Sequence, residues 1–381
     1  MFSRIEALNY RCLRHVSQEL ERFQVLVGPN ASGKTTFLDV VAFLGRLVSD
    51  GLDAAIEERT ADPRDLLWGR TGNTFELAIE ARIPNNLRAA IPKPRSEAIR
   101  YQVRIKLGAD GTDTVLHEEM VSLKGLHRAQ PKSFMQLEFP TPSNPPKTIL
   151  EKSQGPHSQT TVKKRPGGND NFYPEIVGGR RWAPSFKLGP RKSALGNLPE
   201  DESKFPVATW LKTLLAEGVQ QFALNSRAIR QASPPTRTKG FLPDGSNLPW
   251  VIHGLEQTNP AQLREWVAHL RTAFPDLVNV TTIERPDDRH RYLVLDYEGG
   301  LRVPSWMVSD GTLRMLALTL PAYLGELRGA YLIEEPENGI HPRAVEAMYQ
   351  SLSSVYSAQI LMATHSPVIL SLAEPHDVLC F

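Results

Sequence analysis

The segment Gly28–Thr35, GPNASGKT, constrains this chain more than any other feature of its sequence. It matches the pattern GxxxxGK[ST], directly after the apolar run Phe23–Val27 and directly before the apolar positions of a helix around Phe37. Glycines let the backbone curl so that its N–H groups face a phosphate, and the following helix directs the positive end of its dipole there. The sequence therefore predicts a strand, a phosphate-binding loop and a helix, in that order.

Each polar residue of this loop has a predicted role. Lys34 is expected to bridge the β- and γ-phosphates of a nucleotide, and the Thr35 hydroxyl to bind Mg²⁺. A glycine-rich turn with an unrelated lysine is the alternative, and it would need the strand, loop and helix setting to arise by chance. The predicted nucleotide contacts are Gly28, Pro29, Asn30, Ala31, Ser32, Gly33, Lys34, Thr35 and Thr36.

Two further strands end in polar side chains that suit phosphate chemistry. The apolar run Ala330–Ile333 leads into Glu334, predicted to hold Mg²⁺ through water, and Glu335, predicted to polarise the attacking water. The run Leu361–Thr364 leads into His365, which can reach a γ-phosphate and is predicted to act as a switch. A solvated acidic turn would explain either glutamate alone, but it does not explain the pair at a strand end.

Composition narrows the class of protein. The 381 residues are 41% hydrophobic and 23% charged, which excludes a disordered, collagenous or coiled-coil chain. No stretch approaches 18 consecutive apolar residues and the first residues lack the apolar segment of a signal peptide, so we expect a cytoplasmic protein that does not contact membranes. The spacing of Cys12 and Cys380 suggests neither a disulfide framework nor a zinc site.

The charge is unevenly distributed, although the formal net charge is only +2. The stretch 124–192 holds thirteen Lys and Arg against four acidic residues, and ten of the thirty prolines. We interpret it as a basic, proline-rich insertion that the core does not need for folding. It could bind DNA or RNA through its cations, or it could be a merely solubilising loop.

Periodicity predicts the remaining elements. Alternation over 74–81 and 99–105 is typical of antiparallel strands with one face in water. Apolar stripes predict helices over 207–216 and from Pro260 onward, and 278–284 with 292–297 form a predicted strand pair.

The order and spacing of four segments resemble the ABC-type ATPase heads of the structural-maintenance-of-chromosomes (SMC), RecF and overcoming-lysogenization-defect proteins. Stand-alone bacterial ATPases of the AAA family are the most similar group. These segments are 28–36, 308–314, 331–342 and 363–367.

The resemblance implies an α/β P-loop NTPase head with a mixed β-sheet core, a flanking antiparallel β-subdomain and a helical lobe. It divides the chain into lobe I with the phosphate loop (1–123), the basic insertion (124–200), a helical lobe (201–320) and a return to the core (321–381).

Further site residues follow from the resemblance. The signature motif, which would cap the γ-phosphate bound by a second subunit, comprises Ser309, Asp310, Gly311 and Thr312. Segment 337–342 would be the D-loop at the dimer seam, and Arg11 a nucleotide contact. Gln231 is the best candidate for the glutamine that joins Thr35 and Glu334 at the metal.

Some features depart from the family pattern. The signature reads VSDGT instead of the LSGGQ of transporters, which argues against a transporter head. Glu334 stands where an Asp is usual. No long heptad run and no nuclease domain is visible.

The expected function is an ATPase that uses ATP and Mg²⁺, forms a homodimer around two nucleotides and drives a partner. A separately encoded effector in antiphage defence or a toxin–antitoxin pair is favoured, because the aromatic residues of the insertion are scattered. The alternative is a DNA-binding ATPase of repair or recombination, similar to RecF and SMC proteins.

Overall fold

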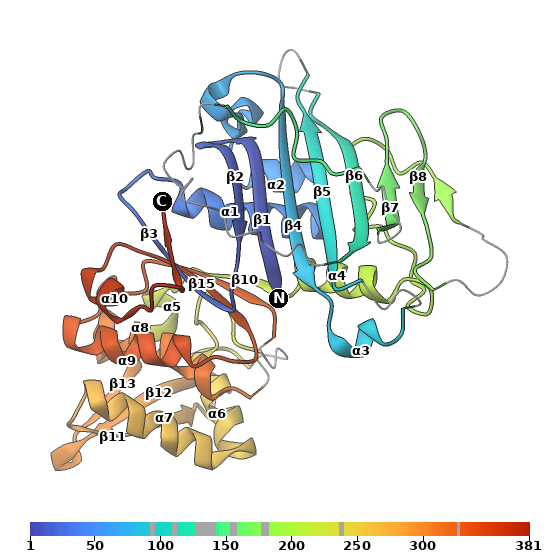
Figure 1. Ribbon diagram of the computed structural model, residues 1–381. Coiled ribbons are helices and arrows are strands. Elements are labelled where there is room, and N and C mark those ends of the chain that lie inside the picture. Colours follow the sequence, from blue (N-terminus) through green and yellow to red (C-terminus); the bar gives the residue numbers. More distant parts are fainter. Residues whose placement is uncertain are drawn as a thin grey trace. The chain divides into compact units, whose positions relative to one another are not determined.

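The computed structural model divides into two compact units (Figure 1). Unit 1 comprises residues 1–21, 29–219 and Phe381, and unit 2 comprises 22–28 and 220–380. The phosphate loop therefore starts at Gly28 in unit 2 and continues from Pro29 in unit 1. The structure describes residues 1–91, 96–108, 113–125, 142, 144–152, 158–176, 183–235, 240–325 and 328–381.

Unit 1 is built on an antiparallel sheet with the strand order β2-β1-β4-β5-β6-β7-β8-β9. Its strands are β1 (Phe2–Tyr10), β2 (Leu13–Glu19), β4 (Thr74–Arg82), β5 (Ala98–Lys106), β6 (Val115–Lys124), β7 (Gln159–Lys164), β8 (Asp170–Phe172) and β9 (Ser185–Phe186). Its helices are α1 (Lys34–Asp50), α2 (Leu52–Glu57), α3 (Asn85–Arg88) and α4 (Pro206–Ala216), with 3₁₀ turns η1 (Pro63–Leu66) and η2 (Trp68–Arg70).

Helix α1 packs closely on both the sheet and helix α4. Its Phe43 ring meets the rings of Tyr10 and Phe75 edge-on, with centroids 5.9 and 5.8 Å away. A Cβ atom added at Gly45 would lie 2.6 Å from the Leu215 carbonyl oxygen, so only glycine permits this approach of α4. The helix that follows the phosphate loop is thus fixed by contacts with the sheet and with α4.

The polar face of β4 and β5 is buried, so the prediction of one face in water is wrong. Arg100 is 1% exposed and pairs with Glu80 at 3.0 Å and with Glu6. It also donates to the carbonyl of Ile149, whose N–H donates to Glu76 at 2.7 Å. Segment 148–151 thus covers this face, and its carbonyls and the ion pairs satisfy the polar side chains that alternate along the strands.

The described part of the basic stretch belongs to the same sheet. Strand β7 pairs with β6, and β8 and β9 continue the order. Lys124 pairs with Glu80 at 2.7 Å, and buried Lys164 pairs with Asp170 at 2.8 Å. Strands β7–β9 therefore continue the sheet of unit 1, and Lys124 and Lys164 neutralise buried carboxylates. That the ATPase core folds without this stretch stays a prediction. Arg128, Lys132, Arg180 and Arg181 lie outside the described residues.

Glu175 caps the start of α4 from a buried position. Its carboxylate accepts the N–H groups of Val207 and Ala208 at 2.7 and 2.8 Å, and the residue is 1% exposed. Burial raises the pKa of Glu175 to about 7, against the lowering effect of these hydrogen bonds.

We expect Glu175→Gln to gain about 3 kcal/mol of stability relative to wild type between pH 4.5 and pH 8. A carboxyl whose pKa is raised by folding contributes stability that is fully present below the unfolded pKa and is lost as pH rises through the folded pKa. Glutamine does not titrate in this range. Any difference in how well it caps α4 therefore shifts the free energy of unfolding by the same amount at every pH. Urea unfolding across this range measures the difference, with exposed Glu200→Gln as the control. Parallel curves for wild type and Glu175→Gln would contradict the prediction.

Unit 2 contains a sheet with the order β10-β14-β15-β3-β16, in which β14, β15, β3 and β16 are parallel. Its strands are β10 (Val219–Phe222), β14 (Ala330–Glu334), β15 (Gln359–Thr364), β3 (Phe23–Val27) and β16 (Val378–Cys380). A second, antiparallel sheet comprises β11 (Leu277–Glu284), β12 (Arg291–Tyr297) and β13 (Arg302–Pro304). The helices are α5 (Ser226–Arg230), α6 (Leu248–Thr258), α7 (Pro260–Ala273), α8 (Asp310–Thr319), α9 (Pro342–Ser353) and α10 (Pro367–Leu372), with 3₁₀ turns η4 (Glu298–Gly300), η5 (Ser305–Met307) and η6 (Leu320–Tyr323).

One hydrophobic core joins the two sheets and the helices of unit 2. Fully buried Trp266 of α7 donates its indole N–H to Thr319 at the end of α8, at 2.8 Å. The predicted strand pair and the predicted helix from Pro260 are confirmed. None of the helices that the structure describes is both long and apolar enough to cross a membrane.

Candidate nucleotide site

The carboxyl ends of three parallel strands lie side by side in unit 2. Val27 at the end of β3 is in register with Thr364 of β15, and Ala363 of β15 is in register with Glu334 of β14. The residues that follow these strands, Gly28 and His365 among them, therefore leave from one edge of the sheet. Open α/β sheets bind ligands at this edge.

Glu335 is held in an unusual backbone conformation. Its φ is 44°, a left-handed value that costs free energy for a residue with a Cβ atom. Its N–H donates to the Ala363 carbonyl at 2.8 Å, and Asn338 donates its amide to Oε2 of Glu335. The His365 Nε2 lies 3.7 Å from Oε1 of Glu335. Since the Glu335 side chain is 46% exposed, its oriented carboxylate can reach a water molecule.

Glu337 fixes the segment that carries His365. Its Oε1 accepts the Thr364 hydroxyl at 2.6 Å and the His365 N–H at 3.1 Å. This function of Glu337 was not predicted from the sequence, which assigned it only to the D-loop. What identifies it is the contact between Glu337, in the loop after β14, and Thr364 at the end of β15, 27 residues later in the chain.

Gln221, and not Gln231, lies beside the acidic strand end. The Gln221 amide donates to Oε1 of Glu334 at 3.2 Å, because β10 is the neighbour of β14 in the sheet. Gln231 follows α5 and lines a pocket with Arg227 and Arg230. Gln231 was chosen because it was expected to follow a strand that leads into the helical region, whereas the strand there, β10, ends nine residues earlier, at Phe222.

The rest of the phosphate loop, in unit 1, has features that suit a nucleoside triphosphate. Ala31 and Gly33 have φ values of 63° and 111°, so the loop curls tightly. Helix α1 starts with no capping side chain and no acidic residue in its first turn, which leaves its dipole available to an anion. Buried Lys34 donates its Nζ to the Pro29 carbonyl at 2.9 Å, across the loop.

Arg11 lies in the turn between β1 and β2 and contacts α1. Its Nη1 is 3.2 Å from Asp39, which also accepts the Tyr10 hydroxyl at 2.6 Å and Nε of Arg59 at 2.7 Å. Burial, followed by the charge of Asp39, raises the pKa of Tyr10. Arg11 is thus fixed to the helix that follows the phosphate loop. Its contact with a nucleotide stays a prediction.

The predicted signature motif forms the start of α8. Ser309 caps the helix by accepting the Thr312 N–H at 3.2 Å, and Asp310 pairs with Nη2 of Arg230 at 2.8 Å. A Cβ at Gly311 would lie 2.1 Å from the Gly339 carbonyl oxygen, so the signature and the D-loop segment fit together only with glycine there. The extra carboxylate of VSDGT is neutralised by an arginine in the same unit.

No cluster of three or more histidine, cysteine or acidic side chains suited to a metal occurs in the part of the chain that the structure describes. A magnesium ion that keeps its waters and binds nucleotide phosphates needs only one or two protein ligands, so such a cluster is not required for it. The metal-binding roles of Thr35 and Glu334 stay predictions.

Comparison with known proteins agrees with this geometry. The profile of a family described as "AAA domain, putative AbiEii toxin, Type IV TA system" matches residues 23–153 and 179–371. The chain belongs to this family. No curated protein matches it.

The fold is that of an ABC-type ATPase head. An SMC head bound to the C-terminal winged-helix domain of ScpA matches 98% of this chain and 91% of its own, with 14% identity and a TM-score of 0.53. The SMC head of Pyrococcus furiosus with an extended coiled coil, bound to the C-terminal domain of ScpA, matches with the same coverage, 12% identity and a TM-score of 0.52. The predicted resemblance and fold class are confirmed.

Proposed function

We propose that this protein binds Mg-ATP at the phosphate loop, dimerises around two nucleotides and hydrolyses them slowly. The observation that carries the proposal is the alignment of the ends of β3, β15 and β14, with Glu335 fixed in a left-handed conformation beside His365. Family membership supports ATP binding, and the fold supports ATPase chemistry.

Each residue of the proposed site has a separate task. Mg-ATP supplies an activated phosphoryl group whose charge the metal partly neutralises. Lys34 and the amides of the loop bind the phosphates, and Thr35 and Glu334 hold the metal, with Gln221 orienting Glu334. Glu335 accepts a proton from the attacking water, and His365 contacts the γ-phosphate. These groups would act mainly through electrostatics, by stabilising the charge that develops on the transferred phosphoryl group.

The second half of each site comes from the other subunit in this proposal. The start of α8, with Ser309 and Gly311, would direct its backbone N–H groups at the γ-phosphate of the partner chain. Asp310 is paired with Arg230, which lowers the repulsion that its carboxylate would otherwise exert on that phosphate.

ATP-driven dimerisation would switch a separately encoded effector. The family's description as a type IV toxin–antitoxin system favours an effector in a toxin–antitoxin pair or in antiphage defence. DNA repair or recombination is the second candidate, which the likeness in fold to SMC heads favours.

Lys34→Ala tests the nucleotide site. We expect its affinity for Mg-ATP to fall at least tenfold, because the variant loses a buried cation aimed into the phosphate loop. Titration with a fluorescent ATP analogue measures the affinity, and exposed Lys187→Ala in unit 1 is the matched control. Undiminished binding by Lys34→Ala would refute the assignment.

A further inference from the structure

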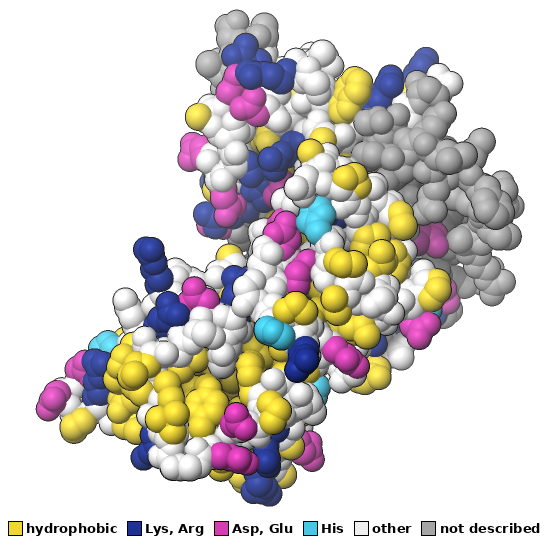
Figure 2. Space-filling model, turned by 90° about the vertical axis from the view of Figure 1, so that its left-hand side faces the viewer, with side chains coloured by type: hydrophobic (Ala, Val, Ile, Leu, Met, Phe, Trp, Pro, Cys, Tyr) yellow, Lys and Arg dark blue, Asp and Glu magenta, His cyan; other side chains and the backbone are white. Residues whose placement is uncertain are grey.

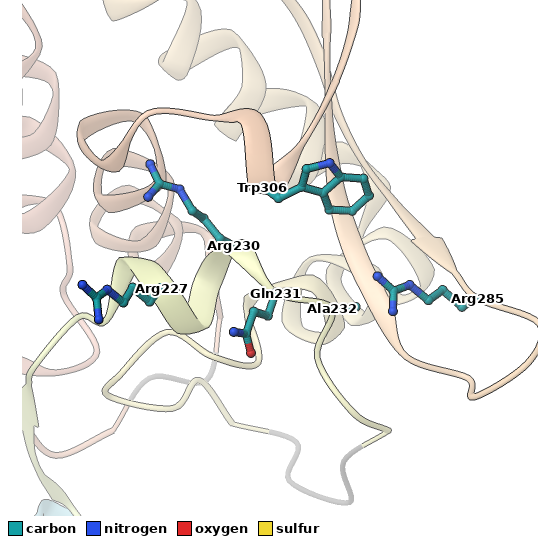
Figure 3. Close-up of a pocket in the computed structure, with 6 residues that line it drawn as sticks. All are labelled: Arg227, Arg230, Gln231, Ala232, Arg285 and Trp306. Carbon is teal, nitrogen blue, oxygen red and sulfur yellow. The ribbon is translucent and has the colours of Figure 1, made fainter.

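Unit 2 contains a pocket of about 590 Å³ whose lining is unusually rich in arginine (Figure 3). Arg227 and Arg230 come from α5, Arg285 from the turn after β11, and Trp306 from η5. Figure 3 shows the two α5 arginines toward one end, Arg285 and Trp306 toward the other, and Gln231 with Ala232 between them. The volume lies within the usual range for small-molecule sites.

The arginines of the pocket are only partly neutralised by acidic side chains. The Arg227 guanidinium is exposed and has no ion pair with any residue that the structure describes. Arg285 is 3.9 Å from Asp288, which is a long ion pair, and its guanidinium lies over the Tyr292 ring at 5.8 Å. Arg230 alone has a close carboxylate, that of Asp310. An anion in the pocket therefore has two weakly neutralised guanidinium groups to bind.

Trp306 offers a flat aromatic surface beside these cations. Its ring packs on Tyr292 with centroids 5.0 Å apart, yet the residue remains 49% exposed. Met307, next to it, is 71% exposed. Figure 2 shows hydrophobic side chains gathered, with basic ones near them, at the level of the β11–β13 sheet. An indole supported from one side and open to solvent can stack a planar ring.

The wall between the arginines and the indole is held firmly. The Arg230 carbonyl accepts the hydroxyl of fully buried Ser305 at 2.9 Å. The backbone of Ser233 exchanges two hydrogen bonds with that of Arg291, at 2.7 and 2.9 Å. Gln231 and Ala232 lie between these anchored residues, so the free-energy cost of ordering this segment on ligand binding would be small.

We propose that this pocket binds a phosphorylated nucleoside, either as a free nucleotide or as one residue of a single-stranded nucleic acid. Guanidinium groups bind phosphate in a bidentate manner, an exposed indole stacks on a base, and the Gln231 amide can donate to and accept from a base edge. An acidic peptide would use the arginines but has no need of the indole, so the combination favours a nucleotide.

Arg230 connects the pocket to the start of α8. Its Nη2 contacts Asp310, and its Nε and Nη2 both donate to the Val308 carbonyl. A phosphate that engages Arg230 competes with Asp310 for the same guanidinium. Occupancy of the pocket would then alter the signature motif and the rate of ATP hydrolysis, a consequence that rests on the proposed function.

Binding is tested in the Lys34→Ala background, which weakens the phosphate-loop site. Calorimetry with adenosine monophosphate and anisotropy with a fluorescein-labelled 15-mer of thymidylate are the two probes. We expect one of them to bind, and Trp306→Ala and the double variant Arg227→Gln, Arg285→Gln each to weaken it at least tenfold. The matched control is Arg302→Gln. Arg302 is an exposed arginine of β13 that does not line the pocket.

Each outcome is decisive. Tight binding of the monophosphate assigns the pocket to a free nucleotide, and binding of the 15-mer alone assigns it to a single strand. If neither probe binds, if the pocket variants bind as the control does, or if hexaglutamate binds and needs the arginines but not Trp306, the proposal is wrong. Far-ultraviolet circular dichroism of each variant checks its folding.

The coupling to ATP hydrolysis has its own readout. In the wild-type protein, the saturating probe should change the rate of phosphate release at least twofold, and Trp306→Ala should abolish that response. Binding without a change in rate would contradict the coupling, although the pocket would still be a binding site for the probe. A protein that binds the probe but releases no phosphate would instead contradict the proposed ATPase function.

Discussion

A Glu335→Gln chain should bind ATP as wild type does and hydrolyse it about 10²–10⁴-fold more slowly. The amide keeps the shape of the side chain and an oxygen for Asn338, but it cannot accept a proton from water. Because hydrolysis ends the ATP-bound state, the variant should also accumulate as a dimer. Phosphate release measures the rate, and light scattering with and without ATP measures the mass.

Glu346→Gln is the control for this experiment, because Glu346 is exposed on α9 and takes no part in the proposed site. It should hydrolyse ATP at the wild-type rate. A Glu335→Gln variant that turns over at the wild-type rate would remove Glu335 from its assigned task. One that is slow but stays monomeric in ATP would contradict the dimer.

Ser309→Arg should fold and bind ATP, yet lose nearly all hydrolysis. A long cation at the start of α8 would occupy the place where the partner's γ-phosphate must dock. Mixed with Lys34→Ala, it should regain about one working site in each heterodimer, because a two-fold interface then joins one intact phosphate loop with one intact signature. The measurement is ATPase activity of the mixture against that of each variant alone.

Ser309→Ala separates this effect from the loss of the helix cap. Both substitutions remove the side chain that accepts the Thr312 N–H, which costs about 1 kcal/mol, but alanine adds neither bulk nor charge. The alanine variant should keep most of its activity. Mixtures with no more activity than their components would show that each site is complete within one chain.

The parts of the site that could be predicted from sequence are those encoded locally. The phosphate loop combines a short motif with the strand before it and the helix after it, and β3 and α1 lie where this pattern predicts. Glu334 and Glu335 likewise follow a recognisable buried strand. Sequence patterns of this kind report on neighbours along the chain.

The parts that were missed depend on contacts between distant segments. Gln221 reaches Glu334 only because β10 adds to the sheet beside β14, 113 residues later in the chain. The polar face of β4 and β5 alternates as an exposed face would, and contacts with distant segment 148–151 help to bury it. Strand β7 was not predicted, because the cations of the basic stretch were interpreted as exposed, whereas Lys164 pairs with Asp170 of β8 and Lys124 with Glu80 of β4.

Phosphate release from Mg-ATP at several protein concentrations tests the central claim most directly. We expect release that stops when Mg²⁺ is chelated, falls to background in Lys34→Ala, and rises more than proportionally with wild-type concentration while dimers are scarce. Release no greater than that of Lys34→Ala would contradict the ATPase assignment. A rate per chain that is constant down to the lowest concentration, in a protein that light scattering shows to be monomeric, would contradict the shared site.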